Sequence, residues 1–248
     1  MGDLFLSSRN CIAPFQSPAY AKEWSCRDSH AFTVTLEGSE KELRSLLSFT
    51  PFEYVTNCFQ IWFCSLQGHT LARTGNYLEC AVTIPARYNE VVGGYTPYMY
   101  CTCIPAILAG REVYGYPKQY AQMQWIETPL AIAANVEKDG TSLMKAAFVF
   151  DVTASAEADL MKEIDAMTRR RLLYKVVPDP LKEKPCFEKI IVRETGRRSS
   201  EEAFGKAFID LFEAEYDPLN RLEISRIIGA KYVRSSYGGK NVEKSIAL

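Results

Sequence analysis

One lysine in this sequence stands where an amine could carry out covalent chemistry. Lys118 follows Tyr116 and Pro117 within the apolar and aromatic stretch 104–123. A proline ring fixes its own backbone angle and biases the preceding residue toward extended geometry, so Lys118 is expected on a stiff backbone. If the side chain is buried, desolvation disfavours the ammonium form, lowers the pKa and leaves a free amine near neutral pH. Such an amine can attack a ketone and form an iminium, a Schiff base.

The same local composition also fits an ordinary surface lysine beside a turn, because lysine is almost never fully buried unless its charge is paired. The neighbouring residues alone therefore leave two interpretations of Lys118 open, a solvated side chain and a reactive amine. The wider pattern of the sequence bears on the choice between them.

Several ordered motifs resemble those of the acetoacetate decarboxylase superfamily. Residues 110–119, GREVYGYPKQ, resemble the family signature, in which Gly-Arg-Glu, a short spacer and Tyr-Pro-Lys precede the Schiff-base lysine. Residues 75–89, GNYLECAVTIPARYN, are similar to the family segment that places an active-site glutamate before an Ile-Pro pair, and Glu79 takes that position. The resemblance spans nearly the whole chain, with further similar segments at 17–20, 169–178 and 217–228.

The resemblance implies a β-rich α+β fold of acetoacetate decarboxylase type, with antiparallel sheets forming a closed or cone-like barrel and helices at its periphery. It also implies that residues 1–248 form a single domain and that the protein is a homo-oligomer. Lys118 takes the role of nucleophile, and Glu79 that of the carboxylate beside the reacting carbon, for proton transfer or electrostatic steering. A strand carboxylate facing water is the alternative for Glu79. No metal and no organic cofactor are implied.

Three residues of the lysine motif have supporting roles by the same resemblance. Arg111 and Glu112 could orient the segment that carries the lysine through an ion pair, and a purely structural role fits them equally well. Tyr116 could line the pocket, with core packing as an equally good interpretation.

The sequence also departs from the family pattern at positions close to the expected site. The decarboxylases place a second lysine directly after the nucleophile, and Gln119 stands there, so that burial alone would have to shift the pKa of Lys118. Gln60 aligns with a family glutamate. Ser29 aligns with a family arginine, which Arg27 could replace only after a shift. Exchanging ionic groups for neutral amides indicates a substrate other than acetoacetate.

These observations favour a lyase that acts on a keto acid. The first hypothesis is decarboxylation of a β-keto acid through an iminium and an enamine on Lys118. The alternative is an aldolase-dehydratase, or a cyclase or dehydratase, of the same superfamily, acting on a pyruvate-like or hydroxylated keto acid, in primary or secondary metabolism. The third hypothesis, from another class, is a binding protein that keeps the pocket but has lost turnover.

The elements that must position these residues can be outlined from periodicity and turn residues. Alternating apolar residues predict a strand at 31–36, and Ser39 with Glu42 predicts a capping box that opens a helix ending before Pro51. The run 59–63 predicts either a pocket wall or ordinary core. Further strands are expected at 58–66, 77–85, 95–102 after a turn at 93–94, 172–177, and in a hairpin of 130–136 with 142–149. Helices are expected at 105–113 and 155–165, while 187–192, 203–212 and 222–233 are of uncertain type.

The bulk composition is that of an ordinary globular protein. The chain has 248 residues, 47% hydrophobic and 24% charged, with a net charge of −1. Nothing in this balance indicates a polyanionic partner, and the basic run 169–171 is too short to be a nucleic-acid footprint. That run fits a helix end, a strand start or a subunit contact.

Eight cysteines and two histidines are present, and no cysteines have the C-x-x-C spacing of a zinc site. Several cysteines lie in apolar runs, which predicts buried reduced thiols. The N-terminus lacks the pattern of a signal peptide, and no apolar run approaches the ~20 residues of a membrane span. A cytoplasmic location and no membrane partner are therefore expected.

Overall fold

The computed structural model describes residues 24–72, 75–151, 157–194, 197–239 and 244–247. Strands dominate these ranges: β1 Trp24–Glu37, β2 Glu53–Tyr54, β3 Cys58–Gln67, β4 Asn76–Tyr88, β5 Val91–Cys101, β6 Lys118–Tyr120, β7 Gln122–Glu127, β8 Ala131–Lys138, β9 Thr141–Phe150, β10 Arg170–Val177, β11 Phe187–Glu194, β12 Arg197–Leu211, β13 Arg226–Gly239 and β14 Lys244–Ala247. The helices are α1 Glu40–Leu47, α2 Ile104–Leu108, the π-helix Ala109–Tyr114, α3 Ala158–Thr168 and the 3-10 helix Leu219–Leu222.

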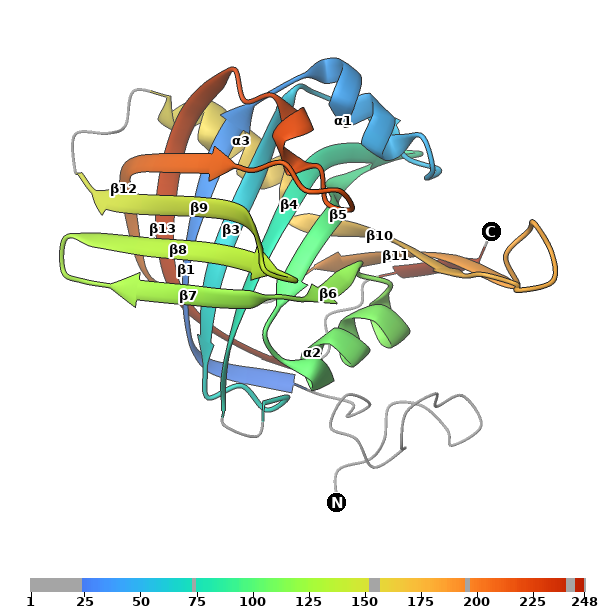
Figure 1. The fold of residues 1–248 in the computed structure, drawn as a ribbon, viewed down its shortest axis with the longest axis horizontal. Coiled ribbons are helices and arrows are strands. Elements are labelled where there is room, and N and C mark those ends of the chain that lie inside the picture. Colours follow the sequence, from blue (N-terminus) through green and yellow to red (C-terminus); the bar gives the residue numbers. More distant parts are fainter. Residues whose placement is uncertain (1–23, 73–74, 152–156, 195–196, 240–243, 248) are drawn as a thin grey trace.

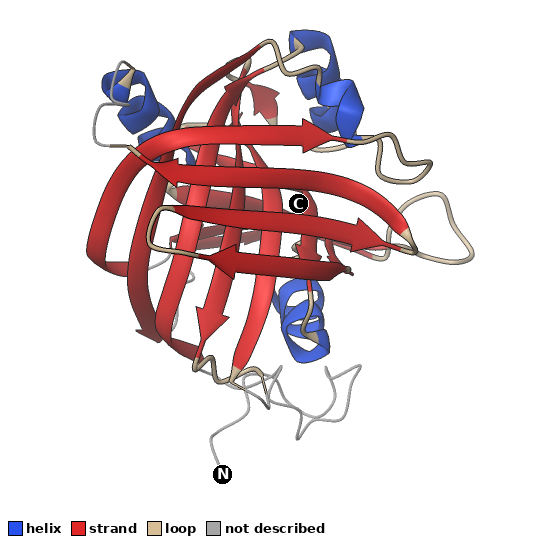
Figure 2. Cartoon of the chain, turned by 60° about the vertical axis from the view of Figure 1, so that its left-hand side comes forward, coloured by secondary structure: helices blue, strands red, loops and turns tan. Residues whose placement is uncertain are grey.

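All of these strands join into one sheet. Its order is β14-β11-β10-β5-β4-β3-β1-β13-β12-β9-β8-β7, with β2 attached to β4 and β6 attached to β5. The sheet curls so strongly that β7, β8, β9 and β12 cross in front of the long strands, while the helices lie at the periphery (Figures 1 and 2). This confirms the β-rich α+β fold. The ends of the sheet, β7 and β14, are not joined, so the curved shell stays open rather than closing into a barrel.

The two faces of the long strands have different environments, because successive side chains of a strand point to opposite faces. On β3, Phe59, Ile61 and Phe63 are fully buried in the main hydrophobic core. Gln60 and Trp62, which alternate with them, face a cavity on the other side. The run 59–63 is therefore both core and pocket wall, one face for each. Burial of the core-face side chains contributes ~25 cal/mol per Å² of apolar surface removed from water. A shift of the strand by one residue would expose these side chains, so their burial stabilises the observed register.

The predicted strands and helices are confirmed with shifted ends, and the three segments of uncertain type are mainly strands, β11, β12 and β13. The predicted turn at Gly93 and Gly94 is wrong. Both lie inside β5, and the chain reverses four residues before Gly93, at Asn89, which has a φ of 51°. A Cβ on Gly93 would lie 2.8 Å from Leu172 Cγ, so these glycines permit close packing against β10.

The predicted capping box does not form. Ser39 does occupy the N-cap of α1 but makes no side-chain capping bond. In a capping box, the side chain of Glu42 would accept a hydrogen bond from the backbone N–H of Ser39. That N–H instead donates to the backbone oxygen of Leu222 at 3.1 Å. Strands β2, β6, β7 and β14 were not expected from the sequence.

The described cysteines carry free thiols, and six of them are buried, as predicted. Cys186 is exposed, and Cys11 lies outside the described residues, as does the family-like segment 17–20. No helix in the described part of the chain is long and apolar enough to cross a membrane.

Candidate functional site

Lys118 and Glu79 meet because of the register of three neighbouring strands. Lys118 begins β6 and pairs with Met99 of β5, which pairs in turn with Ala81 of β4. Glu79 lies two residues before Ala81, so both side chains leave the same face of the sheet. Lys118 Nζ donates to Glu79 Oε1, and only 7% of Lys118 and 8% of Glu79 are exposed. The structure thus brings together the two residues that the sequence singled out.

The charge state of this pair differs from the sequence-based expectation. Burial by itself lowers the pKa of Lys118, but the charge of Glu79 and its hydrogen bond outweigh burial and raise the pKa of the amine above its ordinary value. The expectation that burial alone leaves a free amine is therefore wrong for this pair. In the unliganded protein the raised pKa favours an ammonium ion at Lys118, which donates a hydrogen bond to the buried Glu79.

The aliphatic part of Lys118 packs tightly on the π-helix. A Cβ added to Gly110 would lie 2.6 Å from Cδ and 2.8 Å from Cε of Lys118. Arg111, one residue further, donates from its guanidinium to the backbone oxygen of Lys118 at 3.2 Å. The helix therefore holds both the backbone and the side chain of this lysine.

Replacing Gly110 with alanine should displace the amine of Lys118 from Glu79. A misplacement of ~1 Å can lower a rate by ~10²-fold, so we expect a loss of activity of that order with little change in folding. Rates of borohydride-trapped adduct formation, with far-UV circular dichroism as the folding control, test this. If Gly110→Ala formed the trapped adduct at the wild-type rate, the close contact between Gly110 and Lys118 would not contribute to activity.

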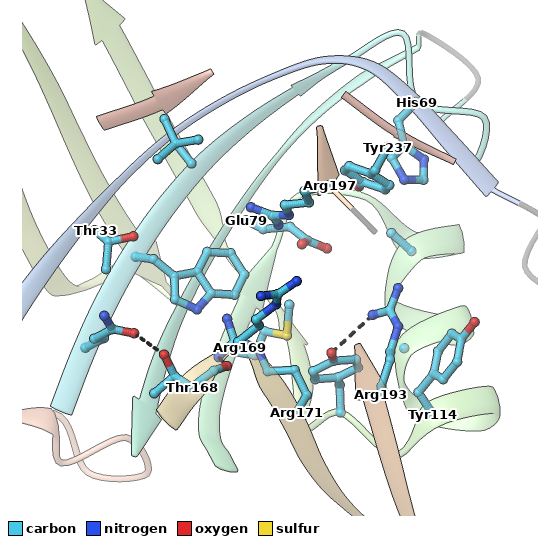
Figure 3. Close-up of a pocket in the computed structure, with 18 of the residues that line it drawn as sticks. Thr33, His69, Glu79, Tyr114, Thr168, Arg169, Arg171, Arg193, Arg197 and Tyr237 are labelled. Atoms are coloured by element: carbon cyan, nitrogen blue, oxygen red, sulfur yellow. Dashed lines mark hydrogen bonds between the residues drawn. The ribbon is translucent and has the colours of Figure 1, made fainter. Parts of the chain in front are cut away.

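The pair opens into a cavity of about 610 Å³. Its floor is the face of β1, β3, β4 and β5, and its other walls come from the helices and from β10 to β13. Figure 3 shows Glu79, His69 and Tyr237 around one side of the hollow, with Thr168, Arg169, Arg171 and Arg193 around the other. Among the described residues, no cluster of three or more His, Cys, Asp or Glu side chains suited to a metal ion is found.

Four arginines line this cavity, and sequence reasoning missed them as site residues. They are Arg169, Arg171, Arg193 and Arg197. The basic run 169–171 was interpreted as a helix end, a strand start or a subunit contact, and it does join α3 to β10. The run gives no periodic signal for this role, because Arg169 still has helical backbone angles at the C-cap of α3 whereas Arg171 lies in β10.

His69 is a second missed residue of the cavity wall. It is buried and packs edge-on against Tyr77 and Tyr237, with ring centroids 5.0 Å and 5.7 Å away. Its Nδ1 accepts the backbone N–H of Leu71 at 3.0 Å, which places the ring proton on Nε2. Burial, followed by smaller charge effects, lowers the pKa of His69 to about 4. His69 is therefore a neutral hydrogen-bond donor at physiological pH.

This low pKa should make the stability of the protein depend on pH. An unfolded histidine titrates near 6.5, so between pH 6.5 and 4 the unfolded state binds more protons than the folded state. The free energy of unfolding should fall by ~3 kcal/mol as the pH drops through this window. Urea titrations of wild type and His69→Gln at several pH values measure the difference. Parallel curves for the two proteins would contradict the assignment.

The other predicted site residues divide into two groups. Gln60 and Tyr116 line the cavity; Gln60 donates to Asp165 at 2.7 Å, and the ring centroid of Tyr116 lies 5.9 Å from Lys118 Nζ. Gln119 points to the opposite face of β6, where it donates to Asp217 at 3.1 Å. The glutamine that stands here in place of the family's second lysine therefore does not change the side chains that line the cavity.

Arg111, Glu112 and Arg27 also lie outside the cavity lining. Arg111 supports the Lys118 backbone, and the backbone oxygen of Glu112 accepts from Lys175 Nζ. Arg27 is exposed and packs over Gly68, and the buried Ser29 contacts Cys64 at 3.1 Å. Neither Ser29 nor Arg27 therefore brings positive charge to the cavity, which receives it from the later strands.

The comparisons with known proteins agree with this fold. The family model for acetoacetate decarboxylase matches residues 12–245. The acetoacetate decarboxylase of Clostridium beijerinckii is 27% identical over 160 residues, which is 64% of this chain and 63% of that protein, so the match spans less than two thirds of its length.

Two solved structures share the fold. An acetoacetate decarboxylase structure superimposes with a TM-score of 0.80 at 19% identity and covers 98% of both chains. The enduracididine biosynthesis enzyme MppR, complexed with the condensation product of pyruvate and imidazole 4-carboxaldehyde, gives a TM-score of 0.72 at 13% identity, over 97% of this chain and 92% of that one.

Proposed function

Because the chain belongs to the acetoacetate decarboxylase family, we propose that it is a lyase that forms a Schiff base between Lys118 and a keto acid and decarboxylates a β-keto acid. The observation that carries this proposal is the buried ion pair of Lys118 and Glu79 at the wall of a cavity rimmed by guanidinium groups. An amine supplies the covalent chemistry, a carboxylate moves its proton, and the positive rim attracts an anionic substrate.

The covalent steps begin with attack of the neutral Lys118 amine on the ketone carbon. The carbinolamine loses water and becomes an iminium, whose positive nitrogen withdraws electrons from the neighbouring bonds. In a β-keto acid the bond to the carboxylate breaks, carbon dioxide leaves, and its bonding electrons form an enamine. Protonation of the enamine carbon and addition of water then release the ketone product and the free amine.

Glu79 is the proton acceptor and donor in these reaction steps. The ammonium form of Lys118 must lose a proton before attack, and the carboxylate bonded to it is the nearest acceptor. Entry of an uncharged carbonyl group excludes water from the pair and favours the neutral amine with the neutral acid over two buried charges. The protonated Glu79 returns this proton to the hydroxyl group that leaves the carbinolamine as water. The proton that the enamine carbon needs comes from solvent water, and Glu79 is placed to relay it.

A second candidate function uses the same iminium for carbon–carbon bond formation. It is supported by the likeness to MppR, whose structure holds the condensation product of pyruvate and an aldehyde. Here the iminium of a pyruvate-like acid loses an α-proton to Glu79, and the resulting enamine attacks the aldehyde. The cavity volume of about 610 Å³ leaves room for both partners.

Two assays separate these functions. Carbon dioxide release from β-keto acids of increasing length measures decarboxylation, and loss of an aldehyde in the presence of pyruvate measures condensation. We expect release of carbon dioxide, with condensation slower. Condensation without any release of carbon dioxide would support the second function, and neither reaction, in folded protein, would contradict both.

A further inference from the structure

We propose that the cavity takes a keto acid with a second carboxylate, remote from the ketone, and that Arg171, Arg193 and Arg197 hold that distal group. This inference rests on the proposed function and names its substrate class. It starts from the charges that line the cavity rather than from the lysine.

The lining cations fall into two groups. Lys118, Lys231 and Arg169 each form an ion pair with a carboxylate, that of Glu79, Asp165 and Glu194 respectively. Within the described residues, no ion pair is found for the other three, Arg171, Arg193 and Arg197. One further carboxylate lines the cavity, that of the exposed Glu202. The cavity therefore keeps an excess of positive charge.

Two of these arginines are placed opposite one another. Arg171 of β10 and Arg193 of β11 are cross-strand partners in the antiparallel pair, an arrangement in which like charges destabilise the sheet. Burial first, and then the nearby Arg197 and Arg193, lower the pKa of Arg171 to about 10. An anion seated between the guanidinium groups would relieve this repulsion.

Arg193 also has an unused donor. One of its terminal nitrogens donates to the hydroxyl of Tyr116 at 3.1 Å, and its guanidinium lies 4.6 Å from the ring centroid of Tyr114. Its Nε is buried and has no hydrogen-bond partner among the described residues. A buried donor without a partner is costly and rare, and a carboxylate oxygen would satisfy it with a charge-assisted bond.

The ring of Tyr116 sets an upper limit on the distance between Arg193 and the amine of Lys118. Its centroid lies 5.9 Å from Lys118 Nζ and 5.8 Å from the guanidinium carbon of Arg193. The two charged groups therefore both lie near one aromatic ring, and their separation is no larger than the sum of those distances. With C–C bonds of ~1.5 Å, a spacer of up to roughly five carbons connects a ketone on Lys118 to a carboxylate on Arg193.

The cluster suits a carboxylate that stays on the substrate better than one that leaves. Arginines bound to the departing carboxylate would stabilise its charge in the ground state and slow its loss. Residues nearer the lysine are less polar, with Met99, Ala109 and Gly110 in the lining. The distal group is thus held by charge while the reacting group remains in less polar surroundings.

A matched pair of β-keto acids tests the inference. 3-Oxoadipate carries the distal carboxylate, and 3-oxohexanoate has the same chain length without it. We expect wild-type protein to prefer 3-oxoadipate in kcat/KM by ~10²-fold, the scale of charge-assisted hydrogen bonds to a carboxylate. Arg171→Gln and Arg197→Gln should each reduce this preference at least ~10-fold. The neighbouring Arg198→Gln should keep it, because Arg198 is exposed and does not line this cavity.

Equal use of both acids by wild type, or an unchanged preference in Arg171→Gln, would overturn the inference while leaving the lyase function intact. Binding without chemistry separates the two proposals. Adipate, which has no ketone, should bind the Lys118→Ala variant in calorimetry at least ~10-fold more tightly than the Lys118→Ala, Arg171→Gln double variant. Equal affinities would also overturn the inference, whereas absence of any Lys118 adduct with either keto acid contradicts the lyase function instead.

Discussion

Replacing Lys118 with alanine should lower the rate of carbon dioxide release by ~10⁴-fold or more, the scale on which removal of a covalent nucleophile acts. The reason is specific to the proposed route, in which every bond change depends on an iminium at Nζ. The variant should still fold but melt at a lower temperature than wild type, because it leaves the buried carboxylate of Glu79 without its cation. Steady-state rates and thermal melting of both proteins measure these effects.

The control for this variant is Lys145→Ala, which removes an exposed lysine that lies near the ring of Phe212. It should behave as wild type in both measurements. If Lys118→Ala kept the wild-type rate, the Schiff-base route would be contradicted. If wild type itself bound keto acids without turnover, and Lys118→Ala bound them equally well, the ligand-binding hypothesis from the sequence would be the better account.

Replacing Glu79 with glutamine should separate adduct formation from turnover. Glu79 is what raises the pKa of Lys118, so in its absence burial dominates and the pKa falls below its ordinary value. The amine is then neutral at lower pH, and the pH profile of borohydride trapping should move to lower pH. Turnover should nevertheless fall by ~10²–10⁴-fold, because the group that relays the proton to the enamine is gone.

The matched control is Glu202→Gln, the same change at a carboxylate that lines the cavity but is exposed. It should leave the trapping profile in place. A trapping profile for Glu79→Gln that moves to higher pH, or trapping and turnover that fall together, would show that Glu79 acts otherwise than as the proton partner of Lys118.

How far the sequence predicts this site depends on which interactions are local. Lys118 and Glu79 could be found because each stands in a motif, and strand alternation then brings them to one face. The arginines could not be found in the same way. Arg171 and Arg193 face each other only because β10 pairs with β11, and they reach the lysine only because β10 joins the sheet beside β5. No local pattern specifies that pairing.

The same limit explains the errors near the lysine. Gln119 directly follows Lys118, but in a strand adjacent side chains face opposite sides, so sequence neighbours are not site neighbours. The pKa of Lys118 was expected to fall with burial, which is correct for an isolated amine. A buried carboxylate 39 positions earlier in the chain reverses the sign. Burial and partner must both be known before the direction of a pKa shift is stated.

The most direct test of the central claim is reduction of the wild-type protein with borohydride in the presence of acetoacetate, followed by mass mapping of the modified peptide. The account predicts a single modified residue, Lys118, carrying an N-isopropyl group, since decarboxylation on the lysine leaves the iminium of acetone. An adduct that retains the carboxylate would show Schiff-base formation without decarboxylation. No adduct on Lys118, with this ketone or with a keto diacid, would contradict the account.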